Sequence, residues 1–269
     1  MKKSAPINIL KGAVISSAML IPGVSGGTTA IILDVYDDLI SSISSFFKET
    51  KKSLFTLLTV GIGAILGIIF FSKAILFVTN KFYVPMMYLF LGAVLGSVPM
   101  LYRKAEIKKF KISCLIYPLI GAACVFLIEL IPKDALKISV DSGIYSYLIV
   151  VLAGIILSIG LILPGISVSY MLLILGIYET TLMSIENKQY MFLISLLLGV
   201  AIGVLLTTKL IEYTMKNYPQ GTYLLIIGFM LVSLKEVFPG IPYGIEIITS
   251  LITFLVGFIS VFYLSKLAD

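Results

Sequence analysis

The chain has 269 residues, of which 59% are hydrophobic and 13% charged, and its mean hydropathy is +1.10. This composition excludes an ordinary soluble globule and predicts an all-α polytopic membrane protein. The net charge of +6 comes almost entirely from lysine, which we interpret as loop asymmetry of a membrane protein and not as nucleic-acid binding. With no histidine and two cysteines in one apolar segment, the sequence predicts no metal and no cofactor.

The first predicted element, 5–47, is an apolar stretch interrupted in its middle by Pro22-Gly-Val-Ser25. In a bilayer such a break is tolerated where it is buried in protein or lines a cavity, because freed backbone groups find no water there. Proline ends the first arm, since it lacks an N–H and restricts the preceding residue. Glycines near the break allow the backbone to approach a ligand closely, namely Gly23, Gly26 and Gly27. The hydroxyl-bearing residues suit the cap of a second arm, namely Ser25, Thr28 and Thr29.

Three apolar stretches follow, each long enough to cross a bilayer, at 54–79, 83–102 and 112–131. A second broken stretch at 145–187 then carries Pro164-Gly-Ile-Ser167. Three more predicted spans complete the chain: 190–214, 221–239 and 244–267.

The second half repeats the first. A shift of 142 residues aligns the two breaks, and a shift of 136 aligns the spans that follow them. The matched pairs are Gly12 with Gly154, Gly23 with Gly165, Ser25 with Ser167, Gly63 with Gly199 and Lys73 with Lys209. The sequence therefore predicts one integrated membrane domain of two repeats, 1–132 and 143–269.

The distribution of lysine predicts the topology. If each broken stretch is a re-entrant helical hairpin, thirteen cations lie on the side of the two termini and five on the other. The positive-inside rule then places both termini in the cytoplasm. Three crossings per half make the second repeat upside down relative to the first, which is an arrangement common in secondary transporters.

The two breaks are the predicted binding site. A second arm that begins at mid-membrane presents free N–H groups and the positive end of its dipole, which favours an anion such as phosphate. The second copy offers Gly165, Ser167 and Ser169 in the same roles. The alternative is that these small residues only pack helices closely.

Two lysines at equivalent positions strengthen the prediction of an anion site. Lys73 and Lys209 each lie inside an apolar span, where a charge is costly. We expect them to attract the anion from the two sides of the membrane; snorkelling toward the interface is the alternative. The paired steps Tyr36-Asp37 and Tyr178-Glu179 are candidates for gating or for coupling to a proton.

These features together resemble the bacterial polyprenyl-phosphate transporter family over nearly the whole chain. Two positions depart from the family pattern, since Val168 and Asp34 stand where glycine is expected. The resemblance implies undecaprenyl phosphate as substrate, returned from the outer to the inner leaflet of the bacterial cytoplasmic membrane for reuse in cell-wall synthesis. The implied partners are this lipid and the surrounding membrane lipids.

Two other functions share features with this sequence. A carrier of a small soluble anion would use the same site without a lateral opening to lipid. An undecaprenyl-diphosphate phosphatase also has paired Pro-Gly-x-Ser loops, but the resemblance to that class would require an arginine directly after the loop serine and glutamates clustered nearby. Here Gly26 and Val168 follow the two loop serines. Without an evident acid, base or phosphate clamp, we expect a transporter and not an enzyme. The sequence leaves open whether the protein is a monomer or a homo-oligomer.

Overall fold

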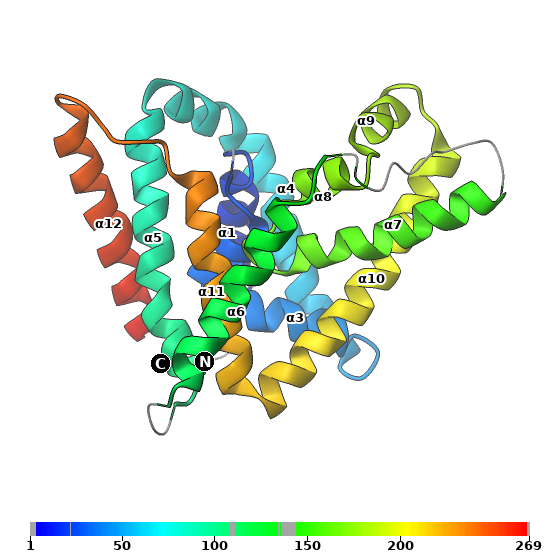
Figure 1. Cartoon of the computed structure of the whole chain (residues 1–269), viewed down its shortest axis with the longest axis horizontal. Helices are drawn as coiled ribbons and strands as arrows, with labels where there is room; N and C mark the ends of the chain where they lie inside the picture. The colour runs from blue at the N-terminus through cyan, green and yellow to red at the C-terminus, as the bar shows by residue number, and fades with distance from the viewer. Residues whose placement is uncertain (1–3, 22, 108–110, 134, 136–143, 268–269) are drawn as a thin grey trace.

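The structure is a computed structural model that describes residues 4–21, 23–107, 111–133, 135 and 144–267. All regular secondary structure in these residues is helical, as the sequence predicts, and Figure 1 shows its arrangement. In chain order the helices are α1 (Ala5–Ala18), α2 (Gly26–Ile32), α3 (Tyr36–Ser44), α4 (Thr50–Lys81), α5 (Tyr83–Lys104), α6 (Ser113–Glu129), α7 (Ile144–Ile162), α8 (Val168–Ile174), α9 (Tyr178–Glu186), α10 (Tyr190–Asn217), α11 (Pro219–Val237) and α12 (Glu246–Leu267).

The order of helices in the first half recurs in the second. Each half begins with an apolar helix that stops at a break, continues through a helix of seven residues and one of nine, and ends with three longer helices. Gly23 and Gly165 have the same left-handed φ of +81° at the two breaks. The inverted orientation of the halves and their division at 1–132 and 143–269 stay predictions.

Glycines hold the broken stretches against the long helices. A Cβ atom added to Gly63 of α4 would lie 2.0 Å from the carbonyl oxygen of Ile9 in α1. The equivalent atom on Gly199 of α10 would lie 2.1 Å from the carbonyl oxygen of Val151 in α7. Small residues that let backbones touch are the usual means of association between membrane helices, where apolar side chains gain little by leaving lipid.

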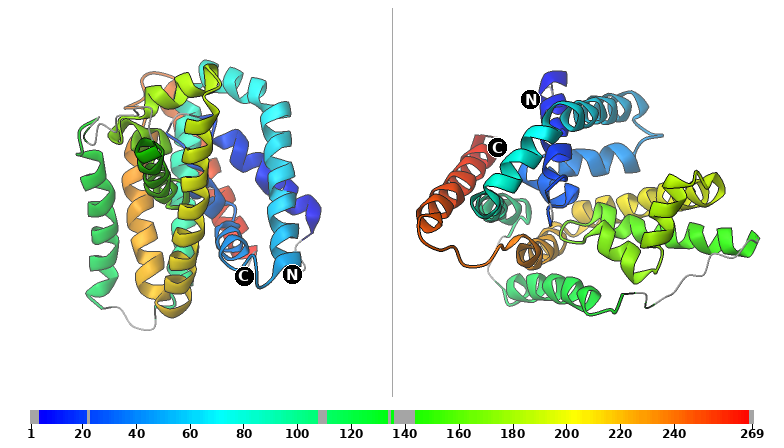
Figure 2. Two further views of the ribbon diagram at one scale, coloured as in Figure 1. Left: turned by 90° about the vertical axis from the view of Figure 1, so that its right-hand side faces the viewer. Right: turned by 90° about the horizontal axis from the view of Figure 1, so that it is seen from above.

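The remaining long helices pair in the same way. Gly92 of α5 approaches the carbonyl oxygen of Phe254 in α12, and Gly228 of α11 approaches that of Pro118 in α6. In Figure 2 the pair α5–α12 lies at one end of the molecule and the pair α7–α10 at the other. Helix α11 packs against both α5 and α6 and so lies between the outer pairs.

Six helices are long and apolar enough to cross a membrane: α4, α5, α7, α10, α11 and α12. Five of them match predicted spans. The predicted span at 112–131 corresponds to α6, which has only 17 residues, and α7 is long enough to cross although we predicted it as one arm of a hairpin. Helices α8 and α9 meet at a bend of 107°. The re-entrant hairpins therefore stay a prediction for 5–47 and 145–187.

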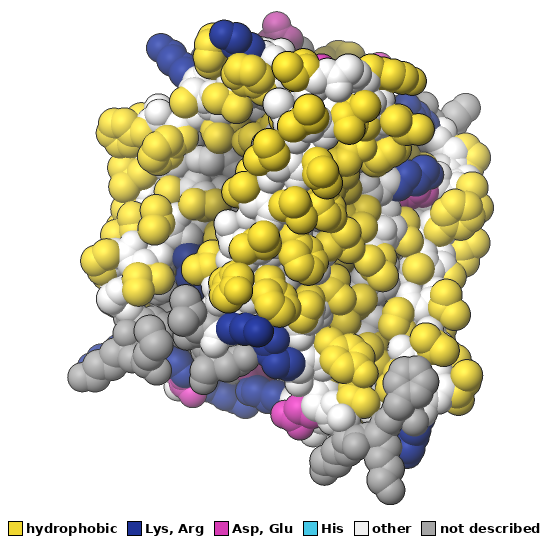
Figure 3. Space-filling model, turned by 90° about the vertical axis from the view of Figure 1, so that its left-hand side faces the viewer, with side chains coloured by type: hydrophobic (Ala, Val, Ile, Leu, Met, Phe, Trp, Pro, Cys, Tyr) yellow, Lys and Arg dark blue, Asp and Glu magenta, His cyan; other side chains and the backbone are white. Residues whose placement is uncertain are grey.

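The outer surface is that of a protein surrounded by lipid. Figure 3 views the side formed by α12 and α5, where hydrophobic side chains form a broad central band and most Lys and Arg side chains lie toward its margins. Leu251, Leu255 and Ile259 of α12 are each about half exposed, at 58%, 45% and 48%. Large apolar side chains in such numbers are stable on a surface only against an apolar solvent. The chain is thus a multi-pass membrane protein.

We predict that Gly63→Ala destabilises the protein by about 1–3 kcal/mol, because the new methyl group overpacks the α1–α4 contact. The matched control is Gly61→Ala on the same helix, where an added Cβ meets no atom within 4 Å. Gly61→Ala should be neutral or stabilising by about 0.5–1 kcal/mol, since alanine favours the helix. Thermal unfolding in detergent measures both, and equal effects would contradict the packing argument.

Candidate functional site

The two chain breaks meet around one cavity of about 360 Å³. It is lined by the end of α1 and the first break on one side, and by α7 and the second break on the other. Of the predicted site residues, the cavity brings together Gly23, Ser25, Gly26, Gly27, Ser167 and Ser169. Gly165 does not line it and packs instead against the carbonyl oxygen of Phe229. Pro22 lies outside the described residues.

The same local geometry forms each break. The left-handed glycine turns the chain, and the serine two residues later caps the short helix that follows. Ser25 Oγ accepts a hydrogen bond from the amide of Thr28 at 3.1 Å, and Ser167 Oγ accepts one from the amide of Tyr170 at 3.4 Å. The caps agree with the prediction from sequence, although each capped helix is only seven residues long.

Two predicted residues support the first break without lining the cavity. Thr28 and Thr29 are both buried, and Thr29 Oγ1 donates to the carbonyl oxygen of Ser25 at 3.0 Å. The hydroxyl of Ser25 donates to Thr28 Oγ1 at 2.7 Å. These contacts hold the turn from within.

Lys73 and Lys209 are exposed and line no part of this cavity. The reason lies in the helix period. Gly67 and Gly203 face α1 and α7, and each lysine comes six residues later, which places it about 120° around the helix from that face. The structure thus places the two lysines outside the cavity, on the surface of α4 and α10.

Glu236 is a cavity residue that sequence reasoning missed. It lies one residue before the end of α11, and its carbonyl oxygen approaches Gly23. Among the described residues that line the cavity, it is the one with a charged side chain. Its position in the sequence, next to Lys235 at the end of a span, is that of an ordinary interfacial acid, so no local signal distinguishes it.

A second cavity of about 300 Å³ adjoins the first and shares Glu236 with it. Here Lys235 Nζ pairs with Glu129 Oε2 of α6 at 3.1 Å. The hydroxyl of Tyr170 donates to the carbonyl oxygen of Glu129 at 2.6 Å. This region lies at the edge opposite the two termini, because α11 runs away from them toward its end at Val237 (Figure 1).

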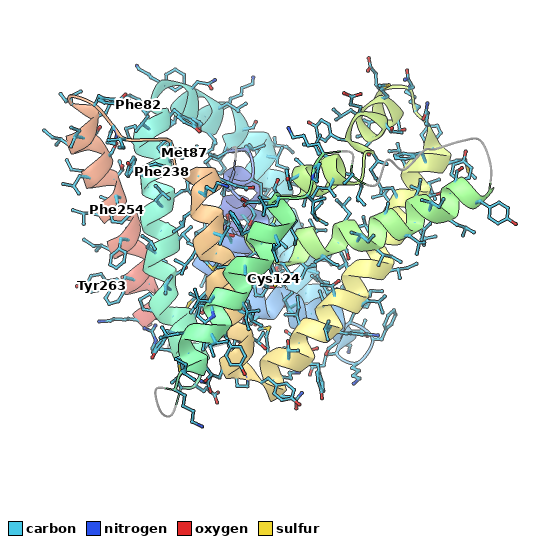
Figure 4. The ribbon with its side chains drawn as sticks, viewed as in Figure 1. Phe82, Met87, Cys124, Phe238, Phe254 and Tyr263 are labelled. Carbon is cyan, nitrogen blue, oxygen red and sulfur yellow. The ribbon has the colours of Figure 1, made fainter. Side chains whose placement is uncertain are left out.

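Apolar packing fixes the end of α11 beside the first break. Val237 lies in a buried cluster with Ile21 and Met87, and the Met87 side chain is fully buried. Beyond the helix, Phe238 makes an edge-to-face contact with Tyr88 of α5, and Figure 4 shows Phe238 and Met87 at the same end of α5 and α11. The position of Glu236 is therefore set by the surrounding core.

The opposite edge, which holds the two termini, carries a network of charged and polar side chains between the halves. Lys104 Nζ, at the end of α5, lies 2.6 Å from Asp34 Oδ1 and 2.8 Å from Asp37 Oδ2. The hydroxyl of Tyr223 in α11 donates to Asp37 Oδ2 at 3.0 Å, and Lys11 Nζ donates to the carbonyl oxygen of Asp34 at 3.1 Å. We call these five residues the terminal-side network.

Helix α3 adds further contacts between the halves, whereas its copy α9 does not. The hydroxyl of Tyr36 donates to the carbonyl oxygen of Ile162 at 3.2 Å, and Ser44 donates to Glu212 of α10. Helix α3 packs against α10, but α9 has no comparable packing against α4, and Glu179 is exposed. Tyr36 and Asp37 are thus held between the halves, while the matching Tyr178 and Glu179 are not.

The fold and the cavity define a helical membrane protein whose internal polar site is formed by two repeated chain breaks, which is the plan of a transporter. Comparison with known proteins makes the class specific. Residues 15–251 match the family described as undecaprenyl phosphate translocase-like. A polyprenyl-phosphate transporter of Staphylococcus aureus (strain NCTC 8325 / PS 47) is 33% identical over 94% of this chain and 93% of its own length.

A polyprenyl-phosphate transporter of Vibrio cholerae serotype O1 is 31% identical over 86% of this chain and 76% of its own length. No solved structure matches the chain. The chain belongs to the undecaprenyl phosphate translocase-like family, which confirms the resemblance found in the sequence. The family and both relatives are named for transport and not for catalysis.

We predict that Gly165→Ala lowers the melting temperature more than Gly240→Ala. Both glycines have a left-handed φ, so both substitutions carry a backbone cost of about 1–2 kcal/mol. Only Gly165 also faces a close contact, because its added Cβ would lie 2.4 Å from the carbonyl oxygen of Phe229, whereas that of Gly240 meets no atom within 4 Å. Thermal unfolding of the two variants in detergent tests this, and equal losses would count against a tightly packed break.

Proposed function

We propose that this protein carries undecaprenyl phosphate, or a closely related polyprenyl phosphate, from the outer to the inner leaflet of the bacterial cytoplasmic membrane. The observation that carries the proposal is that both chain breaks meet around one cavity lined by serine hydroxyls and glycine backbone. The names of the two relatives support the substrate. Return of the lipid to the inner leaflet would make it available again for cell-wall synthesis.

The physical task matches this site. A phosphate headgroup cannot cross about 30 Å of hydrocarbon unaided, whereas a polyprenyl tail is at home there. The protein need shelter only the headgroup. Ser167 and Ser169 offer hydroxyl donors in place of water, as does Ser25 when its hydroxyl turns from Thr28 Oγ1 to the phosphate. Gly26 and Gly27 allow the backbone to approach the phosphate closely.

The two membrane lysines act from outside the cavity in this proposal. Lys73 and Lys209 are exposed on helices whose surfaces are otherwise largely apolar. An ammonium group there attracts a lipid phosphate at the protein surface before the headgroup enters the cavity. As a point charge, lysine holds phosphate less rigidly than the bidentate fork of arginine, which suits a carrier that must release its cargo.

Movement of one half against the other would expose the cavity to each side in turn. With both termini in the cytoplasm, the terminal-side network closes the cytoplasmic side, and the edge of α9 and Glu236 faces outward. The headgroup would then enter from the outer leaflet. Release to the inner leaflet requires that Asp37 separate from Lys104 and Tyr223.

We predict that Asp37→Asn favours opening on the terminal side, because the variant loses one of the two carboxylates that Lys104 pairs with. Ser169→Cys, in a Cys114→Ser/Cys124→Ser background, reports access to the cavity through side-specific labelling by an impermeant maleimide. Labelling from the terminal side should rise severalfold. The matched control is Glu179→Gln, at the repeated but exposed position, which should leave labelling unchanged. Unchanged labelling in the Asp37→Asn variant would show that the terminal-side network does not control access to the cavity.

Transport itself is tested with purified protein in liposomes that contain undecaprenyl phosphate. The rate at which the phosphate becomes accessible to an impermeant reagent should depend on the protein. Ser25→Ala and Ser167→Ala should each slow exchange about tenfold or more, since a hydrogen bond to a charged group is worth about 1.5–3 kcal/mol. Lys73→Ala and Lys209→Ala should also slow it.

Ser195→Ala is the control, because its hydroxyl bonds to Met191 of its own helix. Folded wild-type protein that gives no exchange, with and without proton or sodium gradients, would overturn lipid transport and favour a carrier of a small soluble anion.

A further inference from the structure

The charge of the cavity is opposite to what a phosphate site would be expected to have. No lysine or arginine is among its described lining residues, and Glu236 contributes a carboxylate. The neighbouring Lys235 pairs with Glu129. No hydrogen bond or ion pair joins Glu236 to another of the described side chains. Glu236 is exposed at the mouth of the cavity, and a fully ionised phosphate placed beside it would meet a like charge at short range, which is unfavourable.

One form of phosphate removes this conflict. A phosphomonoester has a second pKa near 6, so close to neutral pH it exchanges readily between a dianion and a monoanion that keeps one P–O–H group. The P–O–H group can donate a hydrogen bond to a carboxylate, and a charge-assisted bond of this type is short and strong. The carboxylate and the headgroup then share one proton.

We infer that Glu236 is a specificity-determining residue that selects a protonated phosphomonoester headgroup. This inference rests on the proposed function and adds the chemical form of the headgroup that the cavity takes. Each headgroup bound would bring one proton with it. The serine hydroxyls donate to the ionised oxygens, and Glu236 accepts from the remaining P–O–H.

The selection has a clear use in a membrane. Common phospholipids are phosphodiesters, which have no P–O–H group to donate, and they far outnumber any carrier lipid. A cavity that relied on cations would bind both classes. A carboxylate instead leaves a diester with an unpaired like charge beside Glu236, and such a repulsive element adds specificity that attractive contacts alone do not give.

The groups around Glu236 are compatible with this role. From α6, Glu129 adds a second negative charge, which Lys235 of α11 partly balances. From α8, Tyr170 directs its hydroxyl to the carbonyl oxygens of Glu129 and Ile131 and so does not neutralise the carboxylate. The local charge therefore favours proton sharing over binding of a dianion.

The test compares two ligands with the same short prenyl tail, a phosphate monoester and its methyl diester, at pH 6.5. Binding to purified protein in detergent is measured by the ligand-dependent rise in melting temperature, which needs no transport activity. The wild type should bind the monoester about tenfold or more tightly than the diester, the value expected for one hydrogen bond to a charged group. Glu236→Gln should bring the ratio close to one.

The matched control is Glu246→Gln, which removes an exposed carboxylate at the start of α12 that does not line the cavity and should keep the wild-type ratio. A wild-type ratio near one overturns the inference without any variant, as does a Glu236→Gln protein that keeps the wild-type preference. In both cases the phosphate site itself stands. Failure of the wild type to bind either ester overturns the proposed function instead.

Discussion

Four helix pairs bring their backbones into contact through glycine, and two of these pairs hold the helix that leads into each break. Between membrane helices there is little hydrophobic driving force, so close packing and hydrogen bonds must supply the association. Gly63 and Gly199 fix α1 and α7 along the long helices α4 and α10. Each short helix can then begin inside the protein, where the freed backbone groups face other protein atoms and not lipid.

This arrangement explains why the site is made of small residues. The turn at each break requires a left-handed glycine, and the serine that follows is used partly to cap its own helix. The remaining hydroxyls and backbone groups line the cavity together with apolar side chains, and no cation is among its described lining residues. The affinity of the cavity for a phosphate headgroup is thereby limited. In our proposal the choice between phosphate headgroups depends on whether the headgroup can donate a hydrogen bond to Glu236.

Hydropathy and the repeated Pro-Gly-x-Ser sequence predict most of the fold and much of the cavity lining. What they do not predict is the facing of residues within helices that are apolar all round, since such helices carry no periodic signal. The sequence predicts Lys73 and Lys209 at the site from their matched positions in the repeat, but these positions do not fix the facing of the side chains. In the structure both lysines are exposed on the outer surface. Contacts between the halves are equally hidden from local sequence: Asp37 and Tyr223 are 186 residues apart in the chain.

The terminal-side network has no counterpart in the repeat. The positions equivalent to Asp34, Lys104 and Tyr223 are Gly176, Gly240 and Met87. One closure thus relies on ion pairs, which weaken as ionic strength rises, whereas a closure made by the other copy would bury mainly apolar surface, which stabilises less on cooling. Salt would then weaken the closure on the terminal side, whereas cooling would weaken the closure on the opposite side. Two copies of one fold can in this way give the two access states of a carrier unequal populations, so that the empty protein is open mainly to one side of the membrane.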